Sequence, residues 1–279
     1  MGEYRPGDGS LRMARIISAV ILVPLAILAV IYAAPGYFLI GIGLLGTICL
    51  YEYFSLTRSM GIPVQPLFGY AAYWLLLFAL RQGRFPTVVL LALVMLAAFL
   101  CAMWRPRQPV RERALAFMAE LSGVFYFALF LYPALAVRYD FGNRIGLEWT
   151  LILLMVIWTG DTAALVVGKA FGKSQLAPVL SPKKTHEGSL AGLAAGLGIA
   201  VAMQHFLFPD LPMHHVIVVS IVLGIFGQLG DLAESMLKRA AQIKDSSHLI
   251  PGHGGALDRM DSLLFAFPVL YFYLLHLYQ

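Results

Sequence analysis

The sequence predicts an all-α protein that crosses a membrane about nine times. Of its 279 residues, 60% are hydrophobic and only 13% are charged, about half the charged fraction of a typical soluble domain. The apolar residues gather in runs close to the ~20 residues that a helix needs to cross a ~30 Å hydrocarbon core. None of the polar segments between these runs is long enough to form a separate soluble domain.

The apolar runs give the expected spans in order. The first run follows a polar, arginine-bearing start and is longer than the apolar part of a typical signal peptide, so we interpret it as a retained span. The expected spans cover residues 16–34, 37–56, 66–80, 85–104, 115–137, 148–170, 188–208, 215–238 and 260–278.

The distribution of positive charge predicts the orientation. If the N-terminus is cytoplasmic, sixteen of the 20 Lys and Arg residues lie in or beside inward-facing segments and four lie outside. An excess of Lys and Arg on the cytoplasmic side is the general rule for membrane proteins. We therefore expect a cytoplasmic N-terminus, a C-terminus on the opposite side, and cytoplasmic loops at 171–187 and 239–259.

Four acidic residues in or beside the later spans are candidate metal ligands. Asp161 lies in the sixth span, Asp231 in the eighth, and Asp258 and Asp261 at the start of the ninth. An ionised carboxylate in hydrocarbon is costly, so such a residue is functional by default. The topology brings all four to a similar depth. Because Mg²⁺ prefers oxygen ligands and shares them with phosphates, we predict that these four bind Mg²⁺, and their number would allow a second cation. One or two of them could instead only pair with a neighbouring Lys or Arg.

The eighth span ends with a polar helix face. Asp231, Glu234, Ser235 and Lys238 follow one another at positions i, i+3, i+4 and i+7, which share one side of an α-helix. This face is expected to lie at the cytoplasmic end of the span, next to the start of the ninth.

The first half of the chain carries two acids within apolar runs, Glu52 and Glu120. Glu52 lies near the cytoplasmic end of its run, where its side chain could reach the surface, and a structural role is favoured for it. The sequence leaves the roles of both residues open.

The two long cytoplasmic loops carry groups suited to phosphate. Lysines, hydroxyl groups and the free amides of a helix start together favour a phosphate group, and the glycines would let the backbone approach one closely. The positive-inside rule alone explains the lysines but not the residues around them. The segments are Ser181-Pro182-Lys183-Lys184-Thr185-His186-Glu187-Gly188 and Pro251-Gly252-His253-Gly254-Gly255.

These residues also carry a family resemblance, confined to about residues 158–261. The longest motif is Ser235-x-x-Lys238-Arg239-x4-Lys244-Asp245 followed by Pro251-x-His253-Gly254-Gly255-x-x-Asp258-Arg259-x-Asp261. It resembles the signature of the phosphatidate cytidylyltransferase (CDP-diacylglycerol synthase) family, and Trp158-x-x-Asp161, Phe171-Gly172-Lys173 and the segment 181–188 are similar to that family too. The departures are Leu165 for an aromatic residue, His186 for Trp, Gln242 for Gly and Ala256 for a larger aliphatic residue.

The resemblance implies transfer of a cytidylyl group from CTP to phosphatidic acid, with Mg²⁺ as cofactor. Residues 1–137 would then form a transmembrane scaffold of about five spans, and residues 138–279 a catalytic region of about four. The expected catalytic residues are Asp231, Lys238, Arg239, His253, Asp258 and Asp261. The expected substrate-binding residues are Ser181, Lys183, Lys184, Thr185, Glu187, Ser235, Lys244, Asp245, Gly254, Gly255 and Arg259.

The same resemblance implies the partners and the location. The substrates would be CTP from the cytoplasm and phosphatidic acid in the bilayer, with no nucleic-acid partner and a homodimer as one option. The expected location is a bacterial cytoplasmic (inner) membrane, with the active site facing the cytoplasm.

Two other readings stay open. A CTP-dependent lipid-alcohol kinase, or another lipid cytidylyltransferase, could use a similar loop on a different acceptor. An ion-coupled transporter could use Asp161 and Asp231 as relay groups, although such proteins often carry inverted repeats and no repeat is evident in this sequence.

Overall fold

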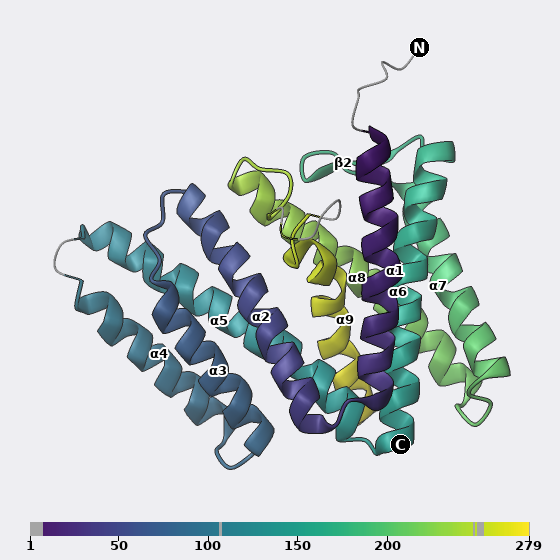
Figure 1. Cartoon of the computed structure of the whole chain (residues 1–279), viewed down its shortest axis with the longest axis horizontal. Helices are drawn as coiled ribbons and strands as arrows, with labels where there is room; N and C mark the ends of the chain where they lie inside the picture. The colour runs from purple at the N-terminus through teal and green to yellow at the C-terminus, as the bar shows by residue number, and fades with distance from the viewer. Residues whose placement is uncertain (1–7, 106–107, 248, 250–253, 279) are drawn as a thin grey trace.

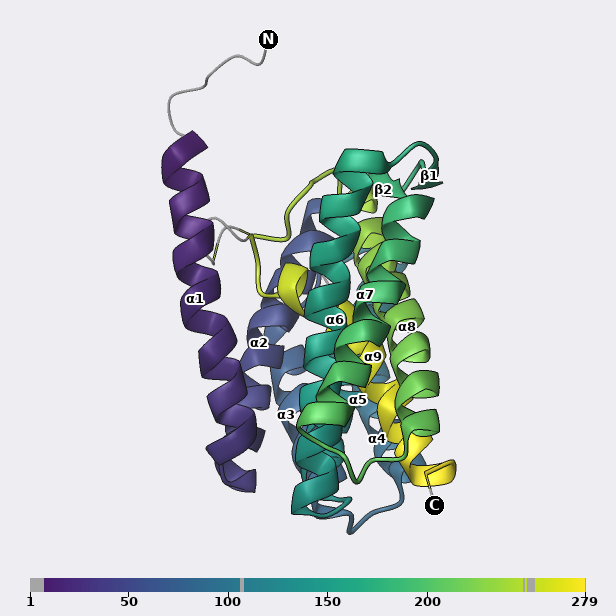
Figure 2. The same ribbon diagram turned by 90° about the vertical axis from the view of Figure 1, so that its right-hand side faces the viewer.

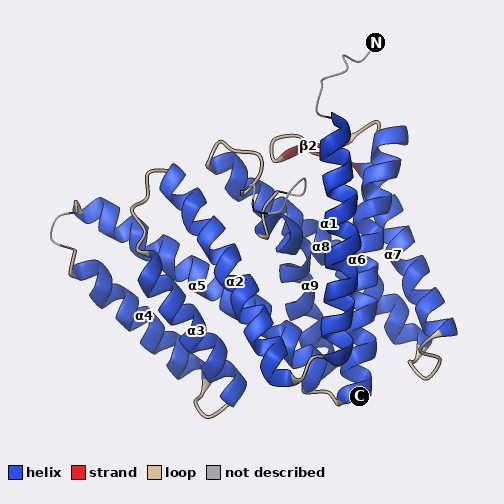
Figure 3. Cartoon of the chain, in the orientation of Figure 1, coloured by secondary structure: helices blue, strands red, loops and turns tan. Residues whose placement is uncertain are grey.

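The computed structural model describes residues 8–105, 108–247, 249 and 254–278, and within these residues the fold is almost entirely helical (Figure 3). This confirms the predicted all-α class. The helices are α1 (Asp8–Tyr32), α2 (Pro35–Ser59), α3 (Pro66–Gln82), α4 (Thr87–Met103), α5 (Val110–Tyr139), α6 (Asn143–Phe171), α7 (His186–Phe206), α8 (Met213–Ala240) and α9 (Leu257–His276).

Five of the helices, namely α2, α5, α6, α7 and α8, are long and apolar enough to cross a membrane. The chain is therefore an integral membrane protein. Each predicted span overlaps one of the helices in the described part of the chain. The number of crossings and the orientation stay predictions.

Local sequence explains where several helices begin and end. Proline stands at the start of α2 and of α3, where its missing N–H would have no helical partner in any case. Gly83 ends α3 with φ 63°, a left-handed conformation that glycine adopts without steric cost.

Helices α5 and α9 connect the two halves of the molecule. Helix α5 packs against α2, α3, α4 and α6, and it also contacts α9. Helix α9 in turn packs against α8 and α6 and reaches α2 (Figure 1). The C-terminal helices that carry the expected site are thus in contact with the N-terminal half.

Helices α6 and α7 approach each other closely through facing glycines. A Cβ atom on Gly192 would lie 2.8 Å from the backbone oxygen of Gly160, and one on Gly188 would lie 2.7 Å from that of Ala164. Small residues at such crossings let two membrane helices pack backbone to backbone. This contact fixes the ends of α6 and α7, between which the first expected phosphate loop lies.

That loop forms a β-hairpin, which the sequence analysis did not predict. Strand β1 (Gln175–Ala177) pairs antiparallel with β2 (Ser181–Thr185). The hairpin lies at the end of the bundle where α1 begins, whereas α9 ends at the opposite end (Figures 1 and 2).

Candidate active site

Three carboxylates converge near the hairpin end of the bundle. Asp231 and Glu234 lie near the end of α8 and Asp261 lies near the start of α9, and one oxygen from each lies within 4.8 Å of the other two. Helices α8 and α9 come close here because Gly230 presents no side chain to the backbone carbonyl of Asp261. Oxygen ligands from several carboxylates suit a hard divalent cation.

The observed group lacks two members of the expected metal set and contains one residue that was not expected. Among the described residues, Glu234 completes the group with Asp231 and Asp261, while Asp161 and Asp258 lie outside it. The sequence placed Glu234 on the right helix face but did not single it out as a ligand. The sequence feature that pointed to Glu234 was its position three residues after Asp231, on the same helix face.

Glu234 is almost fully buried. Its residue is 1% exposed, it forms an ion pair with Lys238, and neither of its oxygens accepts a hydrogen bond from the described residues. A buried carboxylate normally finds hydrogen-bond donors or a cation. Lys238 meets only Oε2, so the acceptor positions of Glu234 beyond this contact fit a bound cation such as Mg²⁺.

Asp258 is held by the protein itself. Its Oδ1 lies 2.6 Å from Lys238 Nζ, and its Oδ2 accepts hydrogen bonds from the backbone N–H groups of Ser246 (3.0 Å) and Gly255 (2.8 Å) and from Ser246 Oγ (2.8 Å). Lys238 therefore bridges Asp258 to Glu234. In this arrangement Asp258 positions the lysine and the loop, and the expectation that it binds metal directly stays a prediction.

Asp161 faces the group from α6. It lines a small cavity of about 20 Å³ between α6, α7 and α8, roughly the size of one water molecule. It lies within electrostatic range of Asp231, Lys184 and Arg259. Asp161 is thus a neighbour of the three carboxylates without being a member of their group.

The hairpin delivers a lysine to the carboxylates. Lys184 Nζ on β2 lies 2.5 Å from Asp231 Oδ2, with both side chains partly exposed. Arg239, at the end of α8, donates from Nε to the backbone oxygen of Leu180 (3.2 Å) and so holds the turn between the two strands of the hairpin. The structure thereby brings together one expected phosphate-binding lysine and one expected metal ligand.

Thr185 and Glu187 stabilise the hairpin and the start of α7. The Thr185 hydroxyl accepts a hydrogen bond from the N–H of Gly188 at 3.1 Å, which is a helix N-cap. Glu187 accepts hydrogen bonds from the N–H groups of Lys173 and Ser174 and from the Ser174 hydroxyl. These contacts explain the Thr-x-Glu-Gly motif, and a substrate role for either residue stays a prediction.

The other described residues of the expected site lie on segments at the same end of the bundle (Figure 1). Ser235 donates from Oγ to Asp231 Oδ1 at 3.4 Å, and Ser181 is half-buried at the start of β2. Gly254 has φ 82°, so a side chain would be strained there. Those with exposed side chains are Lys183, Lys244, Asp245 and Arg259. His253 lies outside the described residues.

Gln242 stands where the family pattern has Gly, and its backbone conformation explains why that pattern has a glycine. Its φ is 57°, in the left-handed region that a residue without Cβ adopts most easily. A glycine would suit this turn, which directly follows the end of α8.

Glu52 is a site neighbour whose role the sequence left open. Rather than reaching the membrane surface, its residue is 1% exposed, and its carboxylate binds Ser246, Ser247 and the first residues of α9. The presence of an acid within an apolar run was the sequence feature that pointed to Glu52. Glu120 is also buried, and it pairs with Arg105 (2.7 Å) away from these residues.

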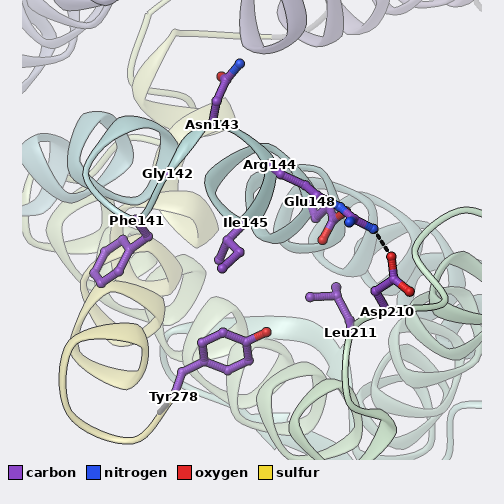
Figure 4. Close-up of a pocket in the computed structure, with 9 residues that line it drawn as sticks. All are labelled: Phe141, Gly142, Asn143, Arg144, Ile145, Glu148, Asp210, Leu211 and Tyr278. Carbon is purple, nitrogen blue, oxygen red and sulfur yellow. Dashed lines mark hydrogen bonds and ion pairs between the residues drawn. The ribbon is translucent and has the colours of Figure 1, made fainter.

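A larger cavity of about 380 Å³ lies at the other end of α6 (Figure 4). Its charged groups pair with one another, because Arg144 binds both Glu148 and Asp210. It contains none of the expected site residues, so we assign it no part in the site.

The fold and the site define an integral membrane protein with a carboxylate group flanked by lysines at one end of its helices. The model of the cytidylyltransferase family matches residues 13–277. The chain therefore belongs to this family.

Several bacterial relatives of this chain are named phosphatidate cytidylyltransferase. The chain is 43% identical over 140 residues to a phosphatidate cytidylyltransferase of Staphylococcus haemolyticus, covering 50% of this chain and 54% of that protein. It is 44% identical over 132 residues to one of Bacillus subtilis, covering 47% and 49%. The match with one of Staphylococcus aureus is 44% over 125 residues, covering 45% and 48%. The chain thus spans about half the length of the curated relatives it matches.

Proposed function

We propose that this protein transfers a cytidylyl group from CTP to phosphatidic acid, giving CDP-diacylglycerol and pyrophosphate. The observation that carries the proposal is the contact of Lys184 with Asp231, within a carboxylate group completed by Glu234 and Asp261. Membership of the cytidylyltransferase family and the name of the relatives support the same reaction.

Transfer of the cytidylyl group depends on neutralising the charge of the phosphates more than on proton transfer. An oxygen of the lipid phosphate forms a bond to the α-phosphorus of CTP, and the bond from that phosphorus to the β-phosphate oxygen breaks. The electron pair leaves with pyrophosphate. Because the attacking phosphate is already ionised, no strong base is needed, and catalysis depends on positioning the anions and stabilising their charge.

Mg²⁺ fits the carboxylate group, where Asp231, Glu234 and Asp261 would hold it. When bound there, the cation would polarise the α-phosphate and stabilise the leaving pyrophosphate.

The basic residues around the group would bind the phosphates. Lys184 already lies at the edge of the carboxylates, while Lys183, Lys244 and Arg259 extend into solvent nearby. Lys238 is more buried and paired on both sides, so we assign it to holding Glu234 and Asp258 in place. The lipid would keep its acyl chains in the bilayer while its phosphate reaches this end of α8.

We further propose that this end of the bundle faces the cytoplasm of a bacterial cell. The excess of Lys and Arg on one side of the expected spans favours this orientation. CTP is a cytoplasmic nucleotide, so the reaction requires the same side.

The test uses the purified protein in detergent with phosphatidic acid and CTP labelled in the cytosine ring, with and without Mg²⁺. We expect label in the lipid only when Mg²⁺ is present, and loss of transfer when the metal is removed with EDTA. A parallel reaction with CTP labelled in the γ-phosphate and a lipid alcohol as acceptor tests the kinase reading. Label from the γ-phosphate alone in the lipid would overturn the proposal.

A further inference from the structure

Glu52 on α2 is bound by donors from the far end of the chain. Its Oε1 accepts hydrogen bonds from Ser247 Oγ (2.5 Å) and from the N–H of Ala256 (3.0 Å), and its Oε2 accepts from Ser246 Oγ (3.0 Å) and from the N–H of Leu257 (2.8 Å). We call these four hydrogen bonds the Glu52 anchor. Two of its donors are amides at the start of α9, where a helix favours a negative charge.

We propose that Glu52 is a positioning residue, which holds the start of α9 so that Asp261 meets Asp231 and Glu234. The inference rests on the proposed function for its kinetic consequences, but its geometry stands without that function. Glu52 lies in the part of the chain expected to be scaffold, and the proposal gives it an indirect role in the site.

The first turn of α9 connects the Glu52 anchor to the carboxylate group. Asp261 follows Leu257 by four residues, or roughly 6 Å along a helix axis. Ser246 strengthens the link, because its hydroxyl lies within hydrogen-bond distance of both Glu52 Oε2 and Asp258 Oδ2 and shares its single proton between them. A shift at the first turn of α9 would therefore move Asp261 relative to α8.

Close packing leaves the anchor little freedom. Gly255 has no side chain, and a Cβ atom there would collide with Ser246 Oγ and with both oxygens of Glu52. Each Glu52 oxygen accepts one amide and one hydroxyl donor. A glutamine at position 52 would turn its own NH₂ group toward one of the two amides, so even this conservative change breaks the arrangement.

Three variants and one matched control test the proposal in the full-length protein in detergent. Glu52→Gln removes the charge, Glu52→Asp shortens the side chain, and Ser247→Ala removes one donor. The control is Glu120→Gln, because Glu120 is also a buried acid of an N-terminal helix and contacts Arg105 and the N–H of Gln65 instead of the site. Each is compared at equal amounts of folded protein.

Three readouts separate positioning from simple stability. The first is kcat and KM for CTP together with the Mg²⁺ concentration that gives half-maximal activity. The second is direct binding of Mn²⁺, followed by electron paramagnetic resonance without substrate. The third is hydrogen exchange at the amides of Ala256 and Leu257 in metal-free protein.

We expect Glu52→Gln to lower kcat and Mn²⁺ affinity by roughly 10- to 100-fold, the range typical of residues that orient metal ligands. KM for CTP should change little, and exchange at Ala256 and Leu257 should accelerate. Glu52→Asp should recover part of the loss, and Ser247→Ala should give a smaller loss that does not add to that of Glu52→Gln. Glu120→Gln should lower the unfolding temperature without changing kcat per folded molecule or Mn²⁺ affinity.

The outcomes that overturn the proposal are distinct from those that overturn the proposed function. If Glu52→Gln and Ser247→Ala keep wild-type kcat and Mn²⁺ affinity, or lose activity only in proportion to unfolding, Glu52 does not position the site. If the wild type binds Mn²⁺ but transfers no cytidylyl group, the proposed function fails while Mn²⁺ affinity and hydrogen exchange still decide the role of Glu52. A wild type that binds no Mn²⁺ without substrate overturns the role of Glu52 in positioning metal ligands, while the label-transfer assay still decides the proposed function.

Discussion

Lys184 Nζ lies 2.5 Å from Asp231 Oδ2, so a residue from the hairpin and one from α8 meet at the edge of the carboxylate group. The two side chains are 24% and 32% exposed, and ion pairs in such positions contribute little to stability. The contact between Lys184 and Asp231 is therefore better explained by a role in the site than by a contribution to the stability of the fold.

Replacement of Lys184 tests that explanation. Lys184→Ala should raise KM for CTP or for phosphatidic acid by roughly tenfold or more, because a hydrogen bond to a charged phosphate is worth about 1.5–3 kcal/mol. The unfolding temperature should stay near that of the wild type. Initial rates measured with each substrate varied in turn provide the check. Lys169→Ala, an exposed lysine at the end of α6, serves as the control, and unchanged dependence on both substrates would contradict the assignment.

Glu234→Gln tests the ligand that the sequence did not single out. The change keeps the shape of the side chain but removes its charge, so Mn²⁺ affinity and kcat should both fall at least tenfold. Glu148→Gln is the matched control, since Glu148 is also buried but lies at the far cavity beside Arg144. Titration with Mn²⁺ followed by electron paramagnetic resonance measures the effect directly. Wild-type affinity in Glu234→Gln would remove Glu234 from the metal site.

Asp258 can be assigned by comparing turnover with metal binding. Asp258→Ala should abolish turnover and leave the protein inserted, but it should lower stability by about 3–5 kcal/mol because Lys238 loses a buried partner. Asp258→Asn should keep the acceptor for Ser246 and Gly255, lose turnover, and change Mn²⁺ affinity little. A large fall in Mn²⁺ affinity in Asp258→Asn would instead favour the direct metal role that the sequence predicts. Activity near that of the wild type in Asp258→Ala would contradict both roles.

The contact between α6 and α7 predicts a pair of glycine variants with opposite effects. Gly192→Ala should destabilise the protein by about 1–3 kcal/mol, since its Cβ would lie 2.8 Å from the backbone oxygen of Gly160 and the two helices would have to separate. Gly198→Ala, six residues on, has open space around its Cβ and should be neutral or stabilise by up to ~1 kcal/mol. Thermal unfolding in detergent compares the two. Equal unfolding temperatures would mean that α6 and α7 do not pack through Gly192.

The sequence predicted the helices well because most of the apolar runs are long and uninterrupted. The hairpin was missed because β2, with the sequence SPKKT, is short and polar and carries no alternation of apolar residues. Its strand character comes from pairing with β1 and from Glu187, which holds the N–H of Lys173. Such contacts between neighbouring segments are not visible in composition.

Within the site, helix spacing could bring Asp231, Glu234 and Lys238 to one face, but it could not assign their partners. Asp258 and Asp261 are three residues apart, which suggested equal roles. The loop before α9 instead supplies three donors to Asp258 Oδ2, and Asp261 alone joins the group. Because those donors come from outside the helix, no periodicity in the sequence encodes the difference.

The Glu52 anchor also bears on how the protein is made. The N–H of Ala256 and its acceptor Glu52 are separated by 204 positions in the chain, so α2 is synthesised and inserted long before its partners exist. Until α9 arrives, α2 carries an unsatisfied carboxylate in a non-polar environment, which is energetically unfavourable. The stable insertion of α2 therefore depends on a helix that is synthesised much later.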